Sequence, residues 1–318
     1  MTPAGPPAGP DFLVGIDFGG TKVAVATADL GGRILEQALI PTNAERGATQ
    51  TVQRALAEAR SLIARTTTRQ GGKVLAAGAV SPGIVLEGGV ELSPNMPGFE
   101  KLGLRRLLQE GLELDLVGVG NDVKAAGEAE ALWGSLVGAD PALFISLGTG
   151  VAAALIVAGR VVVGAHGAAG EVGYSLRGVF DGAAGAGARA PLEEVVGGRG
   201  IGERGSRVLG GSITAADVFA SAGSDLRARF LVDETLAELA VHVANWSILV
   251  DPARIAVGGG LMRSSELILA ALAFRLDHQV PGPPEIVLAR FVHDGALRGA
   301  IALATQTAEA ASAEPVAG

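Results

Sequence analysis

The chain contains no cysteine among its 318 residues. Without thiols it can form no disulfide bond and no metal site that uses cysteine ligands. Histidine is also scarce, and the four that occur are His166, His242, His278 and His293. They are scattered along the chain, and none pairs with another at the spacing of metal ligands. We therefore interpret each histidine as an ordinary surface or core residue.

Long apolar runs and an excess of positive charge are missing as well. No stretch approaches the roughly 18 consecutive apolar residues that a membrane-spanning helix needs, and no charged-then-apolar signal segment opens the chain. The formal net charge is −8, which disfavours a general surface for nucleic acid or for anionic membranes. We expect a cytoplasmic protein that has neither nucleic acid nor a membrane as a partner.

Glycine is abundant, with 48 residues, about twice the usual share of roughly 7%. The length suffices for two domains with cores of their own. Strand-like and helix-like segments alternate, which is typical of α/β proteins with mixed or parallel sheets. Helices are expected over residues 48–67, 102–110, 122–136, 213–222, 235–249, 264–276 and 295–307, and strands over 74–80 and 116–119. Residues 1–10 and those from 308 onward are expected to be disordered.

Two apolar strands meet at a glycine-rich turn between residues 13 and 27. The turn and its flanks contain Asp17, Gly19, Gly20, Thr21 and Lys22. Because glycine has no Cβ, the backbone N–H groups of such a turn can come close to a ligand. The carboxylate and hydroxyl oxygens and the lysine charge suit phosphate groups with bound Mg²⁺. Taken alone, however, the segment is better interpreted as an ordinary hairpin turn.

The same pattern returns later in the chain. Residues 142–157 form a strand, a turn of Gly148, Thr149 and Gly150, and a second strand. A third cluster, Gly258–Gly260, follows another short strand, and its glycines would admit a nucleotide base or ribose against the backbone. Such an internal echo predicts two halves of similar build. Three glycine-rich strand ends in this order resemble the superfamily of sugar kinases, actin and Hsp70, in which ATP binds between two domains.

Four further segments resemble motifs of the ROK family of sugar kinases and regulators. They are Val80-Ser-Pro-Gly-Ile-Val85, Ser93-Pro-Asn-Met-Pro-Gly98, Gly120-Asn-Asp-Val-Lys-Ala-Ala126 and Gly167-Ala-Ala-Gly-Glu-Val-Gly173. The similarity extends from about residue 14 to about residue 304. It implies an α/β, two-domain actin-like ATPase fold with ribonuclease H-like halves and a nucleotide and sugar cleft between the domains. The small domain would comprise residues 11–121 with the helix at about 295–307, and the large domain residues 122–294.

The resemblance also implies a function. It implies an enzyme that uses ATP and Mg²⁺, held by the three glycine clusters, to phosphorylate a hexose, with glucose as the leading substrate. It further implies a homo-oligomer, a homodimer or homotetramer, because such assemblies are common in the family. The alternatives are a kinase for fructose, mannose or an N-acetylhexosamine, and a non-catalytic, sugar-binding regulator. Because Asp17, Thr21 and Asp122 are all retained, the enzyme is favoured over the regulator.

Phosphorylating a sugar hydroxyl requires a group that accepts its proton. The resemblance assigns this role to Asp122 and makes Asn121 the holder of a neighbouring hydroxyl. The competing interpretation is that Asp122 only caps a helix, since aspartate is a preferred N-cap residue.

The remaining sugar contacts implied by the resemblance are Gly83, Asn95, Glu171, Tyr174 and Glu193. Other interpretations are open for three of them: an Asx-turn residue for Asn95, a solvated surface acid for Glu171, and simple packing for Tyr174. Glu193 lines up with a second sugar-binding glutamate of the family less securely than Glu171 does with the first.

The chain also departs from the family pattern. Tyr174 stands where relatives carry a histidine that contacts the sugar and binds zinc, and residues 181–191 contain none of the cysteines of the relatives' zinc loop. Ala152 and Ala153 occupy positions where glycines are common. We therefore expect no zinc site, and the sugar-binding loop must be held by other contacts.

Overall fold

A computed structural model describes residues 9–86, 89–91, 97–178, 181 and 190–313. The chain divides into two compact units, residues 1–129 with 294–318 and residues 130–293. Asn95 and most of the segment 181–191 lie outside the described residues. Within the described residues, no helix is long and apolar enough to cross a membrane.

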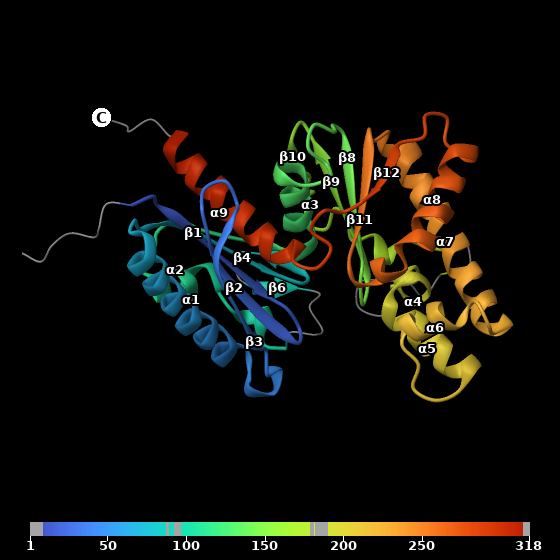
Figure 1. Cartoon of the computed structure of the whole chain (residues 1–318), viewed down its shortest axis with the longest axis horizontal. Coiled ribbons are helices and arrows are strands. Elements are labelled where there is room, and N and C mark those ends of the chain that lie inside the picture. Colours follow the sequence, from blue (N-terminus) through green and yellow to red (C-terminus); the bar gives the residue numbers. More distant parts are fainter. Residues whose placement is uncertain (1–8, 87–88, 92–96, 179–180, 182–189, 314–318) are drawn as a thin grey trace, which may run out of the picture. The chain divides into compact units, whose positions relative to one another are not determined.

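Unit 1 contains a five-stranded mixed sheet (Figure 1). Its strands are β1 (Phe12–Phe18), β2 (Lys22–Ala28), β3 (Ile34–Pro41), β4 (Val74–Ser81) and β7 (Val117–Asn121), in the order β3-β2-β1-β4-β7. The first three strands are antiparallel, whereas β1, β4 and β7 run parallel. A short hairpin of β5 (Ile84–Leu86) and β6 (Gly89–Glu91) follows β4. The parallel strands therefore bring Asp17, Ser81 and Asn121 to the same edge of the sheet.

Helices cover both faces of this sheet. They are α1 (Ala48–Gln70), α2 (Leu104–Leu112) and α9 (Gly295–Ala313). Helix α3 (Asp122–Trp133) follows β7, and short 3₁₀ turns η1 (Ala44–Arg46) and η2 (Phe99–Lys101) precede α1 and α2. Val14 and Ile16 pack with α1 and α2 in one buried cluster. Since neighbouring strand residues face opposite sides, Gly15 points the other way, and an added Cβ there would lie 2.8 Å from Ile301 of α9.

Unit 2 repeats this architecture. Its strands are β8 (Ala142–Leu147), β9 (Val151–Val157), β10 (Arg160–Val161), β11 (Arg254–Gly258) and β12 (Glu285–Leu288), in the order β10-β9-β8-β11-β12. As in unit 1, the first three strands of the chain segment, β8, β9 and β10, pair antiparallel, whereas β8, β11 and β12 run parallel. The two halves of similar build that the glycine turns predicted are confirmed, and so is the α/β fold with two ribonuclease H-like halves.

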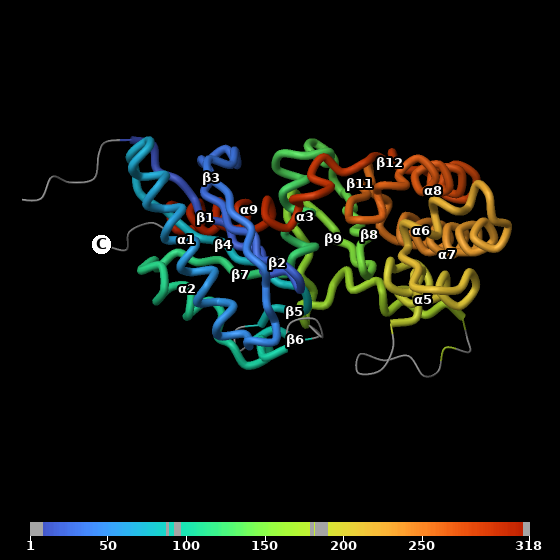
Figure 2. Tube along the Cα trace, turned by 60° about the horizontal axis from the view of Figure 1, so that its bottom comes forward, coloured from blue at the N-terminus to red at the C-terminus, as the bar shows by residue number. Residues whose placement is uncertain are grey.

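The helices of unit 2 gather around a second core (Figure 2). They are α4 (Glu193–Val196), α5 (Gly198–Leu209), α6 (Ala215–Ser221), α7 (Leu226–Val250) and α8 (Ser265–Gln279), with 3₁₀ turns η3 (Val172–Tyr174) and η4 (Gly260–Ser264). Apolar side chains of α5 to α8 pack on β8, β9 and β11. The strand residues that they cover include the fully buried Ile145 and Leu147 of β8 and Val257 of β11. The core thus holds the ends of β8 and β11 in place.

The structure corrects three of the expected elements and adds helix α5. Helix α7 begins at Leu226 rather than at 235, because Asp225 caps it by accepting the Arg227 N–H at 2.8 Å. Helix α3 ends at Trp133 rather than at 136. Helix α9 continues to Ala313, so residues 308–313 are helical rather than disordered. Helix α5 was not expected from its glycine-rich sequence, yet a Cβ at Gly205 would lie 2.4 Å from Val218, so tight helix packing requires glycine there.

Candidate active site

The first glycine turn joins β1 to β2 in unit 1. The Gly19 N–H donates to the Lys22 carbonyl at 3.0 Å. Thr42 secures the turn from outside, since its hydroxyl donates to the Gly19 carbonyl at 2.6 Å and its N–H to the Thr21 carbonyl at 3.0 Å. Within the described residues, the N–H groups of Gly20 and Thr21 have no acceptor. Two backbone donors therefore remain available for an anion, and Thr42 is a supporting residue that the sequence did not indicate.

Asp17 lies at the end of β1 beside this turn. Burial, and to a smaller extent the negative charge of Asp122, raise the pKa of Asp17 to about 7, although the positive charge of Lys22 opposes both effects. Asp17 and Asp122 are therefore electrostatically coupled carboxylates at one edge of the sheet. A bound cation would offset their repulsion, and carboxylate oxygens are ligands that Mg²⁺ accepts. The residues present thus fit a magnesium ion.

Asn121 and Asp122 stand where β7 passes into α3. The Asn121 side chain is 9% exposed. Its amide donates to the Gly83 carbonyl at 2.9 Å, and its Oδ1 accepts the Lys124 N–H at 2.9 Å. Asn121, and not Asp122, therefore caps α3. Asp122 is partly exposed and accepts the N–H of the next residue, Val123, at 2.8 Å.

Gly83 belongs to the same cluster. Its φ of 93° is a left-handed conformation that side chains disfavour, and its carbonyl is held by Asn121. The structure thus brings Asp17, Asn121, Asp122 and Gly83 together in unit 1.

The second glycine turn joins β8 to β9 in unit 2. The Gly148 carbonyl accepts the Gly198 N–H at 2.9 Å, and the Thr149 carbonyl accepts the Arg199 N–H at 3.0 Å. These bonds tie the turn to the start of α5. In the part of the chain that the structure describes, the N–H groups of Thr149 and Gly150 have no acceptor. This turn therefore presents two donors in the same way as the first.

The third cluster lies at the end of β11, next to β8, where Gly258 is in register with Ser146. Gly259 has a φ of 96°, and a Cβ there would lie 2.4 Å from the Leu147 carbonyl. No atom lies within 4 Å of a Cβ added at Gly260. Gly260 borders a cavity of about 300 Å³ whose other lining residues are Ala216, Phe219, Ala220, Leu261, Arg263 and Ser264. The cavity is at the small end of ligand pockets, and its apolar residues suit a flat base.

Three of the expected sugar contacts gather elsewhere in unit 2. Burial raises the pKa of Tyr174, and the negative charges of Glu193 and Glu171 raise it further. The segment carrying Glu171 lies tightly against β9, since the Gly170 carbonyl accepts the Ala153 N–H at 2.8 Å and a Cβ at Gly170 would lie 1.9 Å from the Ala153 carbonyl. Tyr174, Glu171 and Glu193 therefore share one electrostatic environment.

Glu193 has an additional contact that the sequence did not indicate. Its Oε2 accepts the Val151 N–H at 3.3 Å, its Oε1 lies 3.5 Å from Arg199, and a Cβ at Gly150 would lie 2.1 Å from Oε2. The carboxylate thus lies against the second glycine turn. It links the turn to the segment expected to contact the sugar.

Metal ligands are few in this arrangement. Among the described residues, no group of three or more histidine, aspartate or glutamate side chains could hold a metal ion. Magnesium does not require such a group, since it keeps several waters and usually binds one or two carboxylates together with substrate phosphates.

Two sheets of the same strand order, each with a glycine turn of open N–H donors, define a protein of the actin-like ATPase fold. The chain belongs to the ROK family, whose sequence model matches residues 13–307.

Similar proteins of this family carry sugar-kinase names. The N-acetylmannosamine kinase of Escherichia coli (strain SE11) is 28% identical over 294 residues, which cover 91% of this chain and 97% of that protein. The crystal structure of ROK hexokinase from Thermus thermophilus is 26% identical with a TM-score of 0.79, covering 94% of this chain and 99% of that one. A ROK family glucokinase from Streptomyces griseus, in complex with glucose and AMPPNP, is 26% identical with a TM-score of 0.73, covering 93% and 99%.

Proposed function

We propose that this protein is an ATP-dependent kinase that phosphorylates a hydroxyl group of a hexose. The observation that carries the proposal is that Asp122, the first residue of α3, lies close enough to Asp17 to raise its pKa, beside a turn with open N–H donors. Glucose is the first candidate substrate. N-acetylmannosamine is the second, because the name of the curated relative from Escherichia coli favours it.

The nucleotide would be held by the three glycine clusters. The N–H groups of Gly20, Thr21, Thr149 and Gly150 would donate to phosphate oxygens, with Lys22 adding positive charge. Asp17 would bind Mg²⁺. Gly258–Gly260 and the cavity beside Gly260 would receive the base and ribose. When bound, ATP supplies the phosphoryl group and Mg²⁺ neutralises the charge that develops on it.

Asp122 would accept the proton of the attacking sugar hydroxyl. Asn121, held by Gly83 and Lys124, fixes the start of α3 and hence the position of this carboxylate. Glu171, Tyr174 and Glu193 would bind other sugar hydroxyls through carboxylate and phenol oxygens. Asn95 is proposed for the same role and lies outside the described residues.

A coupled assay of ADP release with Mg-ATP tests the reaction. The panel contains glucose, N-acetylmannosamine, N-acetylglucosamine, mannose and fructose. We expect ADP release with at least one of these sugars, with glucose first. Sugar binding by calorimetry without ADP release in the whole panel would instead support the non-catalytic regulator.

Asp122→Ala tests the catalytic assignment. A positioned general base contributes roughly 10²–10⁴-fold to a rate, so kcat should fall by that factor while the circular dichroism spectrum and the sugar affinity change little. Asp115→Ala, which removes an exposed carboxylate of the same unit, is the matched control and should keep the wild-type kcat. A near-normal kcat in Asp122→Ala would contradict the role of this residue.

A further inference from the structure

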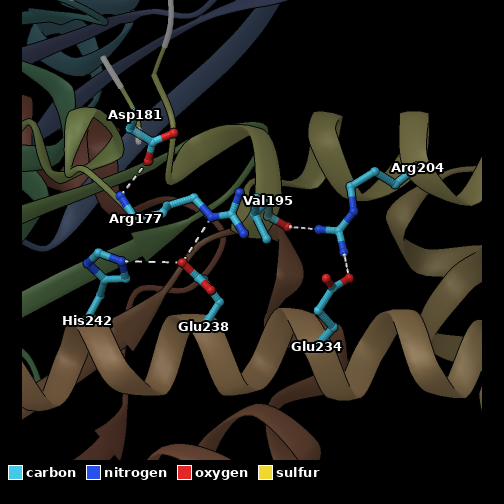
Figure 3. A network of polar contacts seen from close by, with 7 residues as sticks. All are labelled: Arg177, Asp181, Val195, Arg204, Glu234, Glu238 and His242. Carbon is cyan, nitrogen blue, oxygen red and sulfur yellow. Dashed lines mark hydrogen bonds and ion pairs between the residues drawn. The ribbon is translucent and has the colours of Figure 1, made fainter. Parts of the chain in front are cut away.

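The segment that follows Tyr174 is attached to helix α7 by charged groups (Figure 3). The Arg177 N–H donates to the Asp181 carboxylate at 2.7 Å, and its Nε donates to Glu238 Oε1 at 2.9 Å. Glu238 is also 3.6 Å from His242 Nε2, one turn further along α7. One carboxylate on a long helix therefore contacts both an arginine of the segment and a histidine of its own helix.

The Arg177–Glu238 pair is partly shielded from water. The side chain of Arg177 is 34% exposed, that of Glu238 24% and that of His242 11%. Burial lowers the pKa of His242 and Arg177 lowers it further, although Glu238 opposes both effects. His242 is therefore neutral near pH 7, and Arg177 supplies the positive charge that balances Glu238.

A second pair lies one helical turn earlier on α7. Glu234 accepts a hydrogen bond from Arg204 of α5, and Arg204 also donates to the Val195 carbonyl of α4 at 2.9 Å. Residues four apart share one face of a helix, so Glu234 and Glu238 lie side by side, as Figure 3 shows. Glu234 contacts Arg204, which is bonded to α4, the helix that begins with Glu193. Glu238 holds the segment that follows Tyr174.

We infer that Glu238 and Arg177 are positioning residues that hold the Glu171–Tyr174 segment in place for sugar binding, with Glu234 and Arg204 doing the same for Glu193. The inference rests on the proposed function for its substrate. Helix α7 is suited to this role, because one side of it is buried in the core of unit 2 along most of its length. Because the chain has no cysteine, no metal site with cysteine ligands can hold this segment. The Arg177–Glu238 ion pair anchors it instead.

The single tyrosine of the chain allows a direct test. Protein labelled with 3-fluorotyrosine has one ¹⁹F resonance, which reports the environment of Tyr174. In Glu238→Gln we expect that resonance to shift, and we expect the KM for the sugar to rise about fivefold, as for a partly exposed ion pair. The KM for ATP and kcat should stay unchanged. Arg177→Gln changes a residue outside α7 and should give the same result. It provides the test if Glu238→Gln does not fold.

Asp233→Asn is the matched control, because Asp233 pairs with Arg229 at 3.0 Å on the same helix and both side chains are exposed. It should leave the resonance and the KM at wild-type values. Exchanging the charges, with Arg177→Glu and Glu238→Arg together, should bring both readouts back toward wild type.

Unchanged resonance and KM in Glu238→Gln and Arg177→Gln overturn the inference, as does an equal shift in Asp233→Asn. The failure of the proposed function is a separate outcome. In that case the wild-type protein releases no ADP with any sugar, while the ¹⁹F resonance still reports whether Arg177 and Glu238 position Tyr174.

Discussion

At the scale of single residues, neighbouring polar side chains at the end of β1 and the start of α3 differ in their surroundings. Asn121 uses both ends of its amide to join Gly83 to α3. Asp17 is a poorly solvated carboxyl with a pKa of about 7, and Asp122 is partly exposed. Residues of similar chemistry therefore have different tasks, because their hydrogen bonds and burial differ.

The raised pKa of Asp17 predicts a pH-dependent stability. Because the folded protein holds this proton up to about pH 7 and the unfolded chain releases it near pH 4, the free energy of unfolding should fall as the pH rises from 4 to 7 and change little beyond. Asp17→Asn, which has no proton to lose, should be more stable than wild type at pH 8 by about 1–2 kcal/mol after solvent screening, and equal to it at pH 4.

Urea unfolding in magnesium-free buffer at pH 4, 6 and 8 measures this difference. Asp115→Asn, which removes an exposed carboxylate of the same unit, is measured alongside as the matched control. A stability gap between Asp17→Asn and wild type that is the same at pH 4 and pH 8 would show that Asp17 is not the titrating group.

At the scale of elements, helix α9 lies directly on the sheet of unit 1. A Cβ added at Gly78 of β4 would lie 1.9 Å from the Ala300 carbonyl and 2.8 Å from the Ala304 N. Gly299 of the helix likewise faces Ala125 of α3, where an added Cβ would lie 2.4 Å from the backbone. Small residues on both partners therefore allow the close packing.

Gly78→Ala should destabilise the protein by about 3 kcal/mol, the upper range for overpacking, because the opposing atoms are backbone and cannot move alone. The midpoint of urea unfolding measures the effect. Gly223→Ala is the control, since no atom lies within 4 Å of a Cβ there, and it should change the midpoint little. Equal midpoints for the two variants would contradict the close approach of α9.

At the scale of the whole molecule, two units share one strand order and each carries residues that are proposed to bind the sugar. Asn121 and Asp122 belong to unit 1, whereas Glu171 and Tyr174 belong to unit 2. The backbone N–H groups that are proposed to donate hydrogen bonds to phosphate are likewise present in both units, at Gly20–Thr21 and Thr149–Gly150.

Sugar and nucleotide together should therefore slow backbone hydrogen exchange in both units. The expected segments are 82–86 and 119–124 in unit 1 and 170–176 in unit 2, because bound ligands stabilise the closed form of the regions that they contact. Mass spectrometry of the exchanged protein with and without glucose and a non-hydrolysable ATP analogue measures this. Protection in one unit alone would contradict the ligand-binding role of the residues named in the other unit.

The sequence by itself determined the fold class and the three glycine clusters. Strand alternation and turn glycines act over a few residues, so Leu13–Thr27 and the repeat at 142–157 predict hairpins without knowledge of the rest of the chain. Their recurrence predicted two similar halves, which the strand orders confirm. Element boundaries were less predictable, because Asp225 extends α7 and tight packing allows a glycine-rich α5.

Only the tertiary structure decided which side chains are engaged in hydrogen bonds or ion pairs with other parts of the chain. Asn121 holds the Gly83 carbonyl and Glu193 lies on the second glycine turn through contacts between segments far apart in the chain. Thr42, Arg177 and Glu238 carry no local signal in the sequence, since a threonine after a strand or a charge on a helix is usually solvated. Their roles follow from the partners that folding brings within hydrogen-bond distance, and no spacing along the chain specifies those partners.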